Sequence, residues 1–140
     1  MEVWPGAFRL ASYLTQSTAA GEDIAQDVLA AMSLRWGQFD NPAAYLRTAL
    51  VNASWNWNRH TGRVRAKLPL LVTADREEFQ FDELADAIAR LPFRQRAVIV
   101  LRYYSGLSEA EIAVALTCRQ GTVKSLASRA LDALSKEVTR

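Results

Sequence analysis

The stretch that decides the fold lies at the C-terminal end, where residues 108–138 read SEAEIAVALTCRQGTVKSLASRALDALSKEV. Ser108 and Glu111 have the spacing of a capping box, in which each side chain accepts a hydrogen bond from the other residue's backbone N–H. The helical period that starts there is interrupted at residues 117–119 and resumes from about Gln120 to Val138. A short helix, a turn of about three residues and a longer helix are typical of a helix-turn-helix.

The apolar residues of these two helices recur at helical spacing and are expected to face a core. They are Ile112, Ala113 and Leu116 in the first helix, and Val123, Ala127, Ala130, Leu131, Leu134 and Val138 in the second. The opposite face of the second helix carries long donors and hydroxyls, which suit contacts to base edges and phosphates. These candidate DNA-binding residues are Arg119, Gln120, Thr122, Lys124, Ser125 and Arg129. An ordinary solvated helix face remains the alternative.

The rest of the chain also has a helical period. Leu91 precedes Pro92, which is expected to open a helix that ends at Ser105-Gly106, and Asp82 is a plausible N-cap for the helix before it. The inward residues of these two helices are predicted to be Leu84, Ile88, Leu91, Ala97, Val98 and Leu101. Because no alternating strand pattern competes, the sequence predicts an all-α fold.

Three further helices are expected in the N-terminal half. Asn41-Pro42 is a helix start, and this helix is expected to run to about Arg59 and to end at Thr61-Gly62. Two shorter helices are predicted at about residues 7–16 and 19–35. The inward residues are expected to be Ala7, Leu10, Ala11, Leu14, Ile24, Val28, Ala31, Met32, Leu46, Ala49, Leu50, Ala53 and Trp57.

These segments divide the chain into two small helical domains, residues 1–60 and 82–140, joined by an acidic linker at residues 61–81. Residues 66–90 carry 3 basic and 6 acidic residues, whereas residues 91–140 carry 8 basic and 4 acidic residues. The basic excess therefore lies where the DNA-binding element is predicted.

The composition excludes several classes of function. No apolar run is long enough to span a bilayer, and the N-terminus has no secretory signal pattern. Cys118 and His60 are the only cysteine and histidine, so neither an internal disulfide nor a zinc site is expected, and a cytoplasmic location fits. We see no phosphate-cradling glycine loop and no nucleophile–base pair, so neither an enzyme nor a cofactor is predicted.

Three motifs carry a resemblance to a known family. Residues 91–113 read LPFRQRAVIVLRYYSGLSEAEIA, and GTVKS at 121–125 is followed by SRA at 128–130. They resemble region four of the sigma-70 family, in particular the extracytoplasmic-function (ECF) group of actinobacterial type. The resemblance implies a bacterial factor that binds core RNA polymerase and the minus-thirty-five promoter element, with an anti-sigma factor as a further candidate partner. Arg119 stands where the family has a small capping serine, and Leu126-Ala127 replaces an arginine and an apolar residue, so the promoter read here is expected to differ.

The N-terminal half resembles region two of the same family. Residues 21–28 are similar to its polymerase-binding helix, which implies that Asp23, Gln26 and Asp27 contact the polymerase. Residues 36–48 are similar to the part that melts and holds the minus-ten element. The implied contacts to DNA lie on an exposed stripe with Thr48: Tyr45, Asn52, Trp55, Asn56 and Arg59.

Aromatic and amide side chains suit unpaired bases, although Trp55 could equally pack on a neighbouring helix. Two features depart from the family pattern. Few basic residues follow Arg59, and roughly a dozen residues of the usual region two are missing, which implies a shortened region two. An acidic linker would suit a polymerase channel with basic walls, or it could simply be soluble.

Two other functions remain open. A response-regulator-type activator shares the Thr-Val-Lys at residues 122–124 and would bind duplex DNA as a dimer without entering polymerase. A sigma-like adaptor or antagonist would hold a partner and never initiate transcription.

Overall fold

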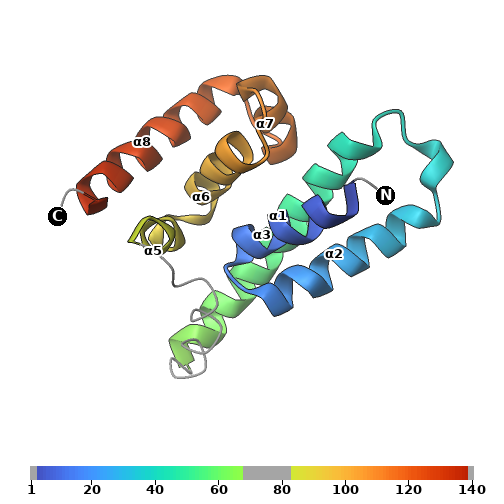
Figure 1. The fold of residues 1–140 in the computed structure, drawn as a ribbon, viewed down its shortest axis with the longest axis horizontal. Helices are drawn as coiled ribbons and strands as arrows, with labels where there is room; N and C mark the ends of the chain where they lie inside the picture. The colour runs from blue at the N-terminus through green and yellow to red at the C-terminus, as the bar shows by residue number, and fades with distance from the viewer. Residues whose placement is uncertain (1–2, 68–82, 139–140) are drawn as a thin grey trace.

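The structure, a computed structural model, describes residues 3–67 and 83–138 of the chain. Within these residues every regular element is a helix, which confirms the predicted all-α class. In chain order the elements are α1 (Val3–Thr15), α2 (Thr18–Ser33), the short 3₁₀ turn η1 (Trp36–Gln38), α3 (Pro42–Lys67), α5 (Glu83–Arg90), α6 (Phe93–Ile99), the π-helical turn η4 (Val100–Tyr104), α7 (Glu109–Leu116) and α8 (Gln120–Val138) (Figure 1).

Helices α1, α2 and α3 form an N-terminal unit whose first turn is built by local hydrogen bonds. Gln16 has a left-handed backbone with φ of 58° and ends α1. The hydroxyl of Ser17 then accepts from the backbone N–H of Ala20 at 3.1 Å and caps α2. The reversal places α1 against α2, and α3 closes the unit over a core that includes Leu10, Leu14, Ile24, Met32, Leu46 and Leu50.

A glycine sets how closely α1 and α2 approach. A Cβ added at Gly21 would lie 2.3 Å from the Ser12 hydroxyl oxygen and 2.6 Å from the Ser12 backbone nitrogen. Because the backbone itself is in the way, a larger side chain would force the two helices apart. The helix pair therefore depends on glycine at this position.

Helices α5 to α8 form the C-terminal unit, and local signals set its turns. Pro92 precedes α6, and η4 ends at Ser105 and Gly106, the latter with a φ of 70°. The capping box is present: the Glu111 backbone N–H donates to the Ser108 hydroxyl at 3.1 Å, and the Ser108 N–H donates to Glu111 Oε1 at 3.0 Å. Thr117, with a left-handed φ of 54°, ends α7 and turns the chain into α8, as the helix-turn-helix pattern predicts.

The predicted end of α3 was wrong. The helix continues through Thr61 and Gly62 to Lys67. A single glycine inside a helix costs only about 1 kcal/mol relative to alanine, and it is followed by arginine, alanine and lysine, which favour helix. The first proline after Pro42 is Pro69, so nothing earlier breaks the backbone hydrogen bonding.

Three residues predicted to face the core are exposed instead: Ala31, Leu84 and Leu131. The buried stripe of α8 runs through Ala127, Ala130 and Leu134, and Leu131 lies one position, or about 100°, around the helix from it. Ala31 has the same relation to the buried Met32. Leu84 is 48 % exposed and lies in the first turn of α5. The spacing of apolar residues predicts which face of this helix points inward, but it does not predict whether a neighbouring helix extends far enough to cover the first turn.

Two predictions concern residues outside what the structure describes: the capping role of Asp82 and the burial of the Val138 side chain. The remaining residues predicted to face inward are buried or half-buried. The structure also buries residues that the periodicity missed, among them Val51, Ser54 and Arg96.

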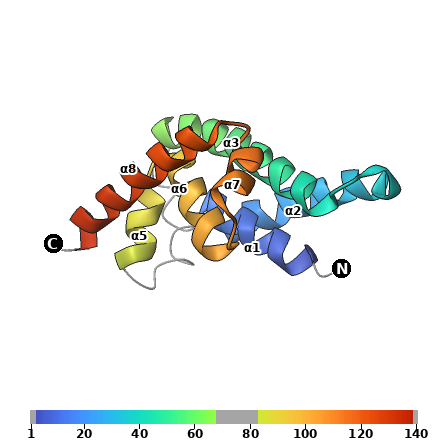
Figure 2. The same ribbon diagram turned by 90° about the horizontal axis from the view of Figure 1, so that it is seen from above.

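The two units share one hydrophobic core, which the sequence did not predict. Core residues of α1 and α3, such as Leu14 and Leu50, belong to one cluster with Val98, Leu101 and Ile112 of the C-terminal unit. The connection between α2 and α3 and the C-terminal end of α8 extend in opposite directions from the centre of the molecule (Figure 2). No helix within residues 3–67 or 83–138 has both the length and the apolarity needed to cross a bilayer.

Candidate nucleic-acid interface

The outer face of α8 presents the side chains that the sequence singled out. Arg119, Gln120, Lys124, Ser125 and Arg129 are exposed, and Thr122 is half-buried. The opposite face is anchored in the core through Val123, Ala127 and Ala130. The structure therefore brings five of the predicted residues to the first three turns of α8 and Arg119 to the position directly before it.

Arg119 occupies the position before α8. Its backbone carbonyl accepts from the N–H groups of Thr122 at 3.0 Å and Val123 at 3.2 Å. A serine here could cap the helix with its hydroxyl, whereas an arginine side chain has no acceptor. The guanidinium is therefore free to reach outward while the backbone alone begins the helix.

An open hollow lies between α7 and the start of α8. Its lining includes Val114, Thr117, Arg119 and Gln120. Val114 is 61 % exposed and was not singled out from the sequence, where it lies inside an apolar run. An exposed valine beside long donors suits contact with a thymine methyl group.

The stripe on α3 forms a connected cluster. Asn52, Trp55, Asn56 and Arg59 are exposed on this helix. Arg59 donates to the Asn56 side-chain oxygen at 3.1 Å, and its guanidinium lies 5.6 Å from the centre of the Trp55 ring. An aromatic face, an amide and a cation thus occupy one surface, which suits stacking and hydrogen bonding to bases.

Tyr45, at the start of α3, belongs to a second cluster with the segment before the helix. Its ring lies 4.4 Å from that of Phe39, and its hydroxyl accepts from Arg35 at 3.2 Å. Leu34 and Trp36 lie in the same segment and are 86 % and 48 % exposed. Trp36 lies within the segment 36–48 that the family resemblance singled out, whereas Leu34 and Arg35 were missed.

Trp55 is shared between the two units. Its ring lies 5.3 Å from the ring of Phe93 on α6, yet 39 % of the residue stays exposed. Asn52 and Trp55 also line a pocket of about 320 Å³ together with Phe93 and Arg94. Trp55 therefore packs on a neighbouring helix and also keeps an exposed face, so both alternatives predicted for it hold.

The predicted polymerase-binding residues lie on α2, a different helix from those that carry the candidate DNA-binding residues. Asp23, Gln26 and Asp27 are exposed, and Gln26 donates to the Glu22 carboxylate at 3.4 Å. On the other side of the helix Ile24 is buried against the core. The three predicted residues therefore share a solvent-facing patch.

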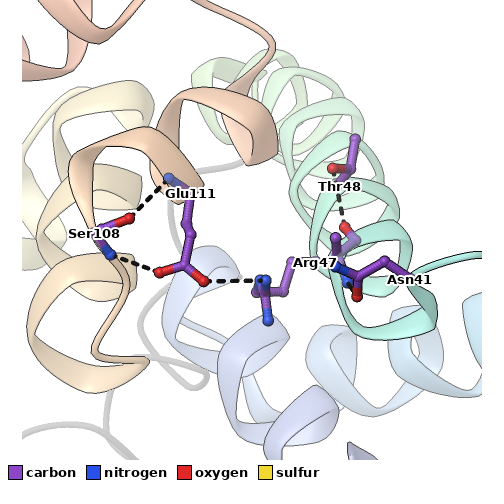
Figure 3. A network of polar contacts seen from close by, with 6 residues as sticks. Asn41, Arg47, Thr48, Ser108 and Glu111 are labelled. Atoms are coloured by element: carbon purple, nitrogen blue, oxygen red, sulfur yellow. Dashed lines mark hydrogen bonds and ion pairs between the residues drawn. The ribbon is translucent and has the colours of Figure 1, made fainter.

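Glu111 links the helix-turn-helix to α3 (Figure 3). Its carboxylate lies 3.9 Å from the Arg47 guanidinium, while Asn41 caps the same helix by accepting from the Ala44 N–H at 3.1 Å. Hydrogen bonds from the Ser108 backbone and hydroxyl, together with the Arg47 charge, hold the pKa of Glu111 below its usual value. Within the described ranges, no three His, Cys, Asp or Glu side chains gather as a metal site would require.

Comparison with known proteins identifies the family. Residues 81–134 match the family described as Sigma-70, region 4. The chain is 33 % identical over 138 residues to the RNA polymerase sigma-E factor of Streptomyces coelicolor, which covers 93 % of this chain and 78 % of that protein. The ECF RNA polymerase sigma factor SigL of Mycobacterium tuberculosis is 36 % identical over 145 residues, covering 91 % of this chain and 79 % of SigL. The chain belongs to the sigma-70 family, in its ECF group.

The fold of this ECF sigma factor is also found in a solved structure. The sigma factor RpoE from Bartonella quintana, in complex with the anti-sigma factor NepR, has a TM-score of 0.79 at 24 % identity, covering 99 % of this chain and 92 % of that one. The match thus extends over both helical units. Sigma factors bind core RNA polymerase and direct it to promoters, so the predicted family, the function and the partners core polymerase and promoter DNA are confirmed, and a response-regulator-type activator is not favoured.

Proposed function

We propose that this ECF sigma factor divides promoter recognition between two surfaces, the outer face of α8 and the exposed stripe of α3. The face of α8 reads the upstream, minus-thirty-five element as duplex. The stripe of α3, with the segment before it, holds the melted minus-ten strand. The observation that carries the proposal is the joint cluster of Trp55, Asn56 and Arg59, which offers a stacking surface and donors together.

The assignment to α8 is supported by its donors and by its place in a helix-turn-helix. The second helix of this motif presents its N-terminal residues to the major groove. Arg119, Lys124 and Arg129 supply charge for phosphates or guanines, while Gln120, Thr122 and Ser125 supply shorter contacts. Val114 is added to this surface for its exposed methyl groups.

The assignment to α3 is supported by the mixture of residue types. Base stacking on an aromatic side chain contributes about 1–3 kcal/mol and tolerates any base. Tyr45 and Trp55 supply rings, and Asn52, Asn56 and Arg59 supply hydrogen bonds. The bounds of α3 support assigning this role to residues 1–67, and we assign upstream reading to residues 82–140.

The acidic patch on α2 is proposed to dock on core polymerase, since its three residues are exposed and serve no contact within the core. The protein would then act in the bacterial cytoplasm as a non-catalytic subunit of the initiating enzyme. An anti-sigma factor is proposed as a further partner, because the structural relative from Bartonella quintana was solved with one.

Copurification with core polymerase tests the docking surface. Asp23→Lys with Asp27→Lys should abolish copurification while circular dichroism shows an intact fold. Asp132→Lys with Glu137→Lys is the matched control, since it changes the net charge equally at exposed positions on α8. Polymerase binding that survives in the first variant, or is lost equally in both, would contradict the assignment.

A further inference from the structure

The segment that connects α2 to α3, residues 34–41, is closed by one arginine (Figure 1). The Arg35 guanidinium lies 5.4 Å from the centre of the Phe39 ring and 6.0 Å from the centre of the Tyr45 ring. It also donates a hydrogen bond to the Tyr45 hydroxyl at 3.2 Å. Because the two rings themselves lie 4.4 Å apart, Arg35, Phe39 and Tyr45 form a single group, the loop cluster.

The two rings of the loop cluster are anchored in the N-terminal unit. Phe39 is half-buried and packs against the core, and Tyr45 lies in the first turn of α3. Arg35 instead follows the end of α2, where its N–H donates to the Met32 carbonyl at 3.0 Å and its carbonyl accepts from the Gln38 N–H at 2.9 Å. The side chain of Arg35 therefore connects the start of the segment to its anchored end.

The residues on either side of Arg35 are the exposed apolar side chains of this segment. Leu34 and Trp36 both face solvent, and Leu34 is the more exposed of the two. An indole ring stacks on an unpaired base, and an aliphatic side chain can be inserted beside a base step. Since the Arg35 side chain is directed at the rings, the conformation that it holds sets where Leu34 and Trp36 point.

We propose that Arg35 is a positioning residue for the minus-ten strand. Acting through Phe39 and Tyr45, it fixes residues 34–41 in the conformation that presents Leu34 and Trp36 to unpaired bases. Arg35 thereby influences which bases are accepted without contacting them. This inference rests on the proposed function of α3 and the segment before it as the part that holds the strand.

A direct contact with a phosphate is the alternative use of the Arg35 charge. Among the residues that the structure describes, no carboxylate forms an ion pair with Arg35. The two roles have different signatures. Loss of one phosphate contact lowers the slope of log affinity against log salt by about 0.7 on single-stranded DNA, whereas loss of a positioning residue changes the base preference and leaves the slope unchanged. The geometry favours positioning, because the guanidinium already contacts both rings and the Tyr45 hydroxyl.

Amide hydrogen exchange in the free full chain tests the positioning step. Arg35→Ala should lower the protection of the Gln38 amide by about two- to fivefold, as expected for the loss of an exposed cation–π contact. Tyr45→Phe keeps the ring but removes the hydroxyl that accepts from Arg35, so it should have a smaller effect. Arg102→Ala is the matched control, since its guanidinium lies 5.8 Å from the centre of the Tyr103 ring in the C-terminal unit. Unchanged protection in Arg35→Ala would overturn the proposal.

Base preference tests the consequence for promoter recognition. A promoter that the parent opens with core polymerase is randomised at its minus-ten element, and the opened DNA is sequenced. Arg35→Ala should weaken the preference for the best base by about threefold, and Arg35→Lys should restore part of it, because an ammonium group also binds ring faces. Adding Tyr45→Phe to Arg35→Ala should change little more, since both act through one contact. Arg102→Ala should match the parent.

An unchanged base preference in Arg35→Ala would overturn the proposal, and a salt slope lowered by about 0.7 would then assign Arg35 to a phosphate. Failure of the proposed function would show separately, as promoter opening that survives Tyr45→Ala with Trp55→Ala. The exchange result in the free chain separates that failure from a failure of the Arg35 inference, because it requires neither polymerase nor DNA.

Discussion

The two surfaces proposed to bind DNA differ in their packing in the free protein. Lys124, Ser125 and Arg129 of α8 face solvent. On α3, by contrast, Trp55 packs on Phe93, and Tyr45 packs on Phe39. Charged donors are well solvated and can remain exposed in the free protein. Exposed aromatic rings instead tend to pack against nearby apolar groups. A surface that reads duplex DNA can therefore stay exposed to solvent before binding. A surface that stacks unpaired bases is better packed against other side chains until DNA binds.

The largest expected effect comes from removing the rings of α3. Tyr45→Ala with Trp55→Ala should leave polymerase binding intact but lower promoter opening by roughly a hundredfold, because each lost stacking contact is worth about 1–3 kcal/mol. Permanganate reactivity of thymines in the polymerase complex measures the opening. Tyr103→Ala is the control, since Tyr103 is 61 % exposed and lies outside both surfaces. Equal opening by all three proteins would show that α3 does not hold the strand.

The next effect concerns the face of α8. Lys124→Ala and Arg129→Ala should each weaken duplex binding and reduce the slope of log affinity against log salt by about one, as the loss of one phosphate contact requires. The matched control is Lys136→Ala, because Lys136 is on the same helix but near its far end and pairs with Asp132 at 3.3 Å. If the control lowers the slope as much as the two test variants, the charge of α8 acts without a defined reading face.

The features predicted correctly from the sequence are those that depend on residues close together in the chain. Ser108 with Glu111, and Asn41 with Pro42, are short-range signals, and the structure places a helix start at each. The exposure of the outer face of α8 was likewise predicted from the helical spacing of its apolar residues. These features depend on residues within one or two turns of each other, so no knowledge of the rest of the molecule was needed.

What the sequence could not show depends on contacts between distant segments. Arg96 lies between two apolar stretches and reads as an ordinary surface arginine, yet its acceptors include Leu14 and Asn58. The helix beyond Thr61 was missed because a glycine was taken as a stop signal. The pairing of Trp55 with Phe93 needed the relative placement of the two units, which no periodicity encodes.

A smaller effect tests the support for the helix-turn-helix. Ser108→Ala removes the hydroxyl that accepts from the Glu111 backbone N–H. Loss of an N-cap hydroxyl costs about 1 kcal/mol, so the variant should be less stable in urea by that amount without a change in the salt slope of DNA binding. Ser135→Ala, in an exposed position on α8, serves as the reference. An unchanged free energy of unfolding would mean that the capping box does not stabilise α7 in solution.

The smallest effect is dependent on pH. Because the pKa of Glu111 is lowered in the folded protein by the Ser108 hydrogen bonds and by Arg47, its carboxylate adds stability above the ordinary glutamate pKa. That contribution is lost as the pH falls through the lowered pKa. Thermal melts of the parent and of Glu111→Gln should therefore differ at pH 7 and converge once the pH has fallen below the lowered pKa of Glu111. A difference that persists in acid would assign the effect to the shape of the side chain rather than to its charge.

Permanganate footprinting on a genomic promoter pool tests most directly whether the chain initiates transcription through both proposed surfaces. The full chain with core polymerase should produce reactive thymines around start sites, and neither partner alone should do so. If the chain copurifies with polymerase but yields reactive thymines on no promoter, the account is contradicted. The protein would then be a sigma-like adaptor or antagonist.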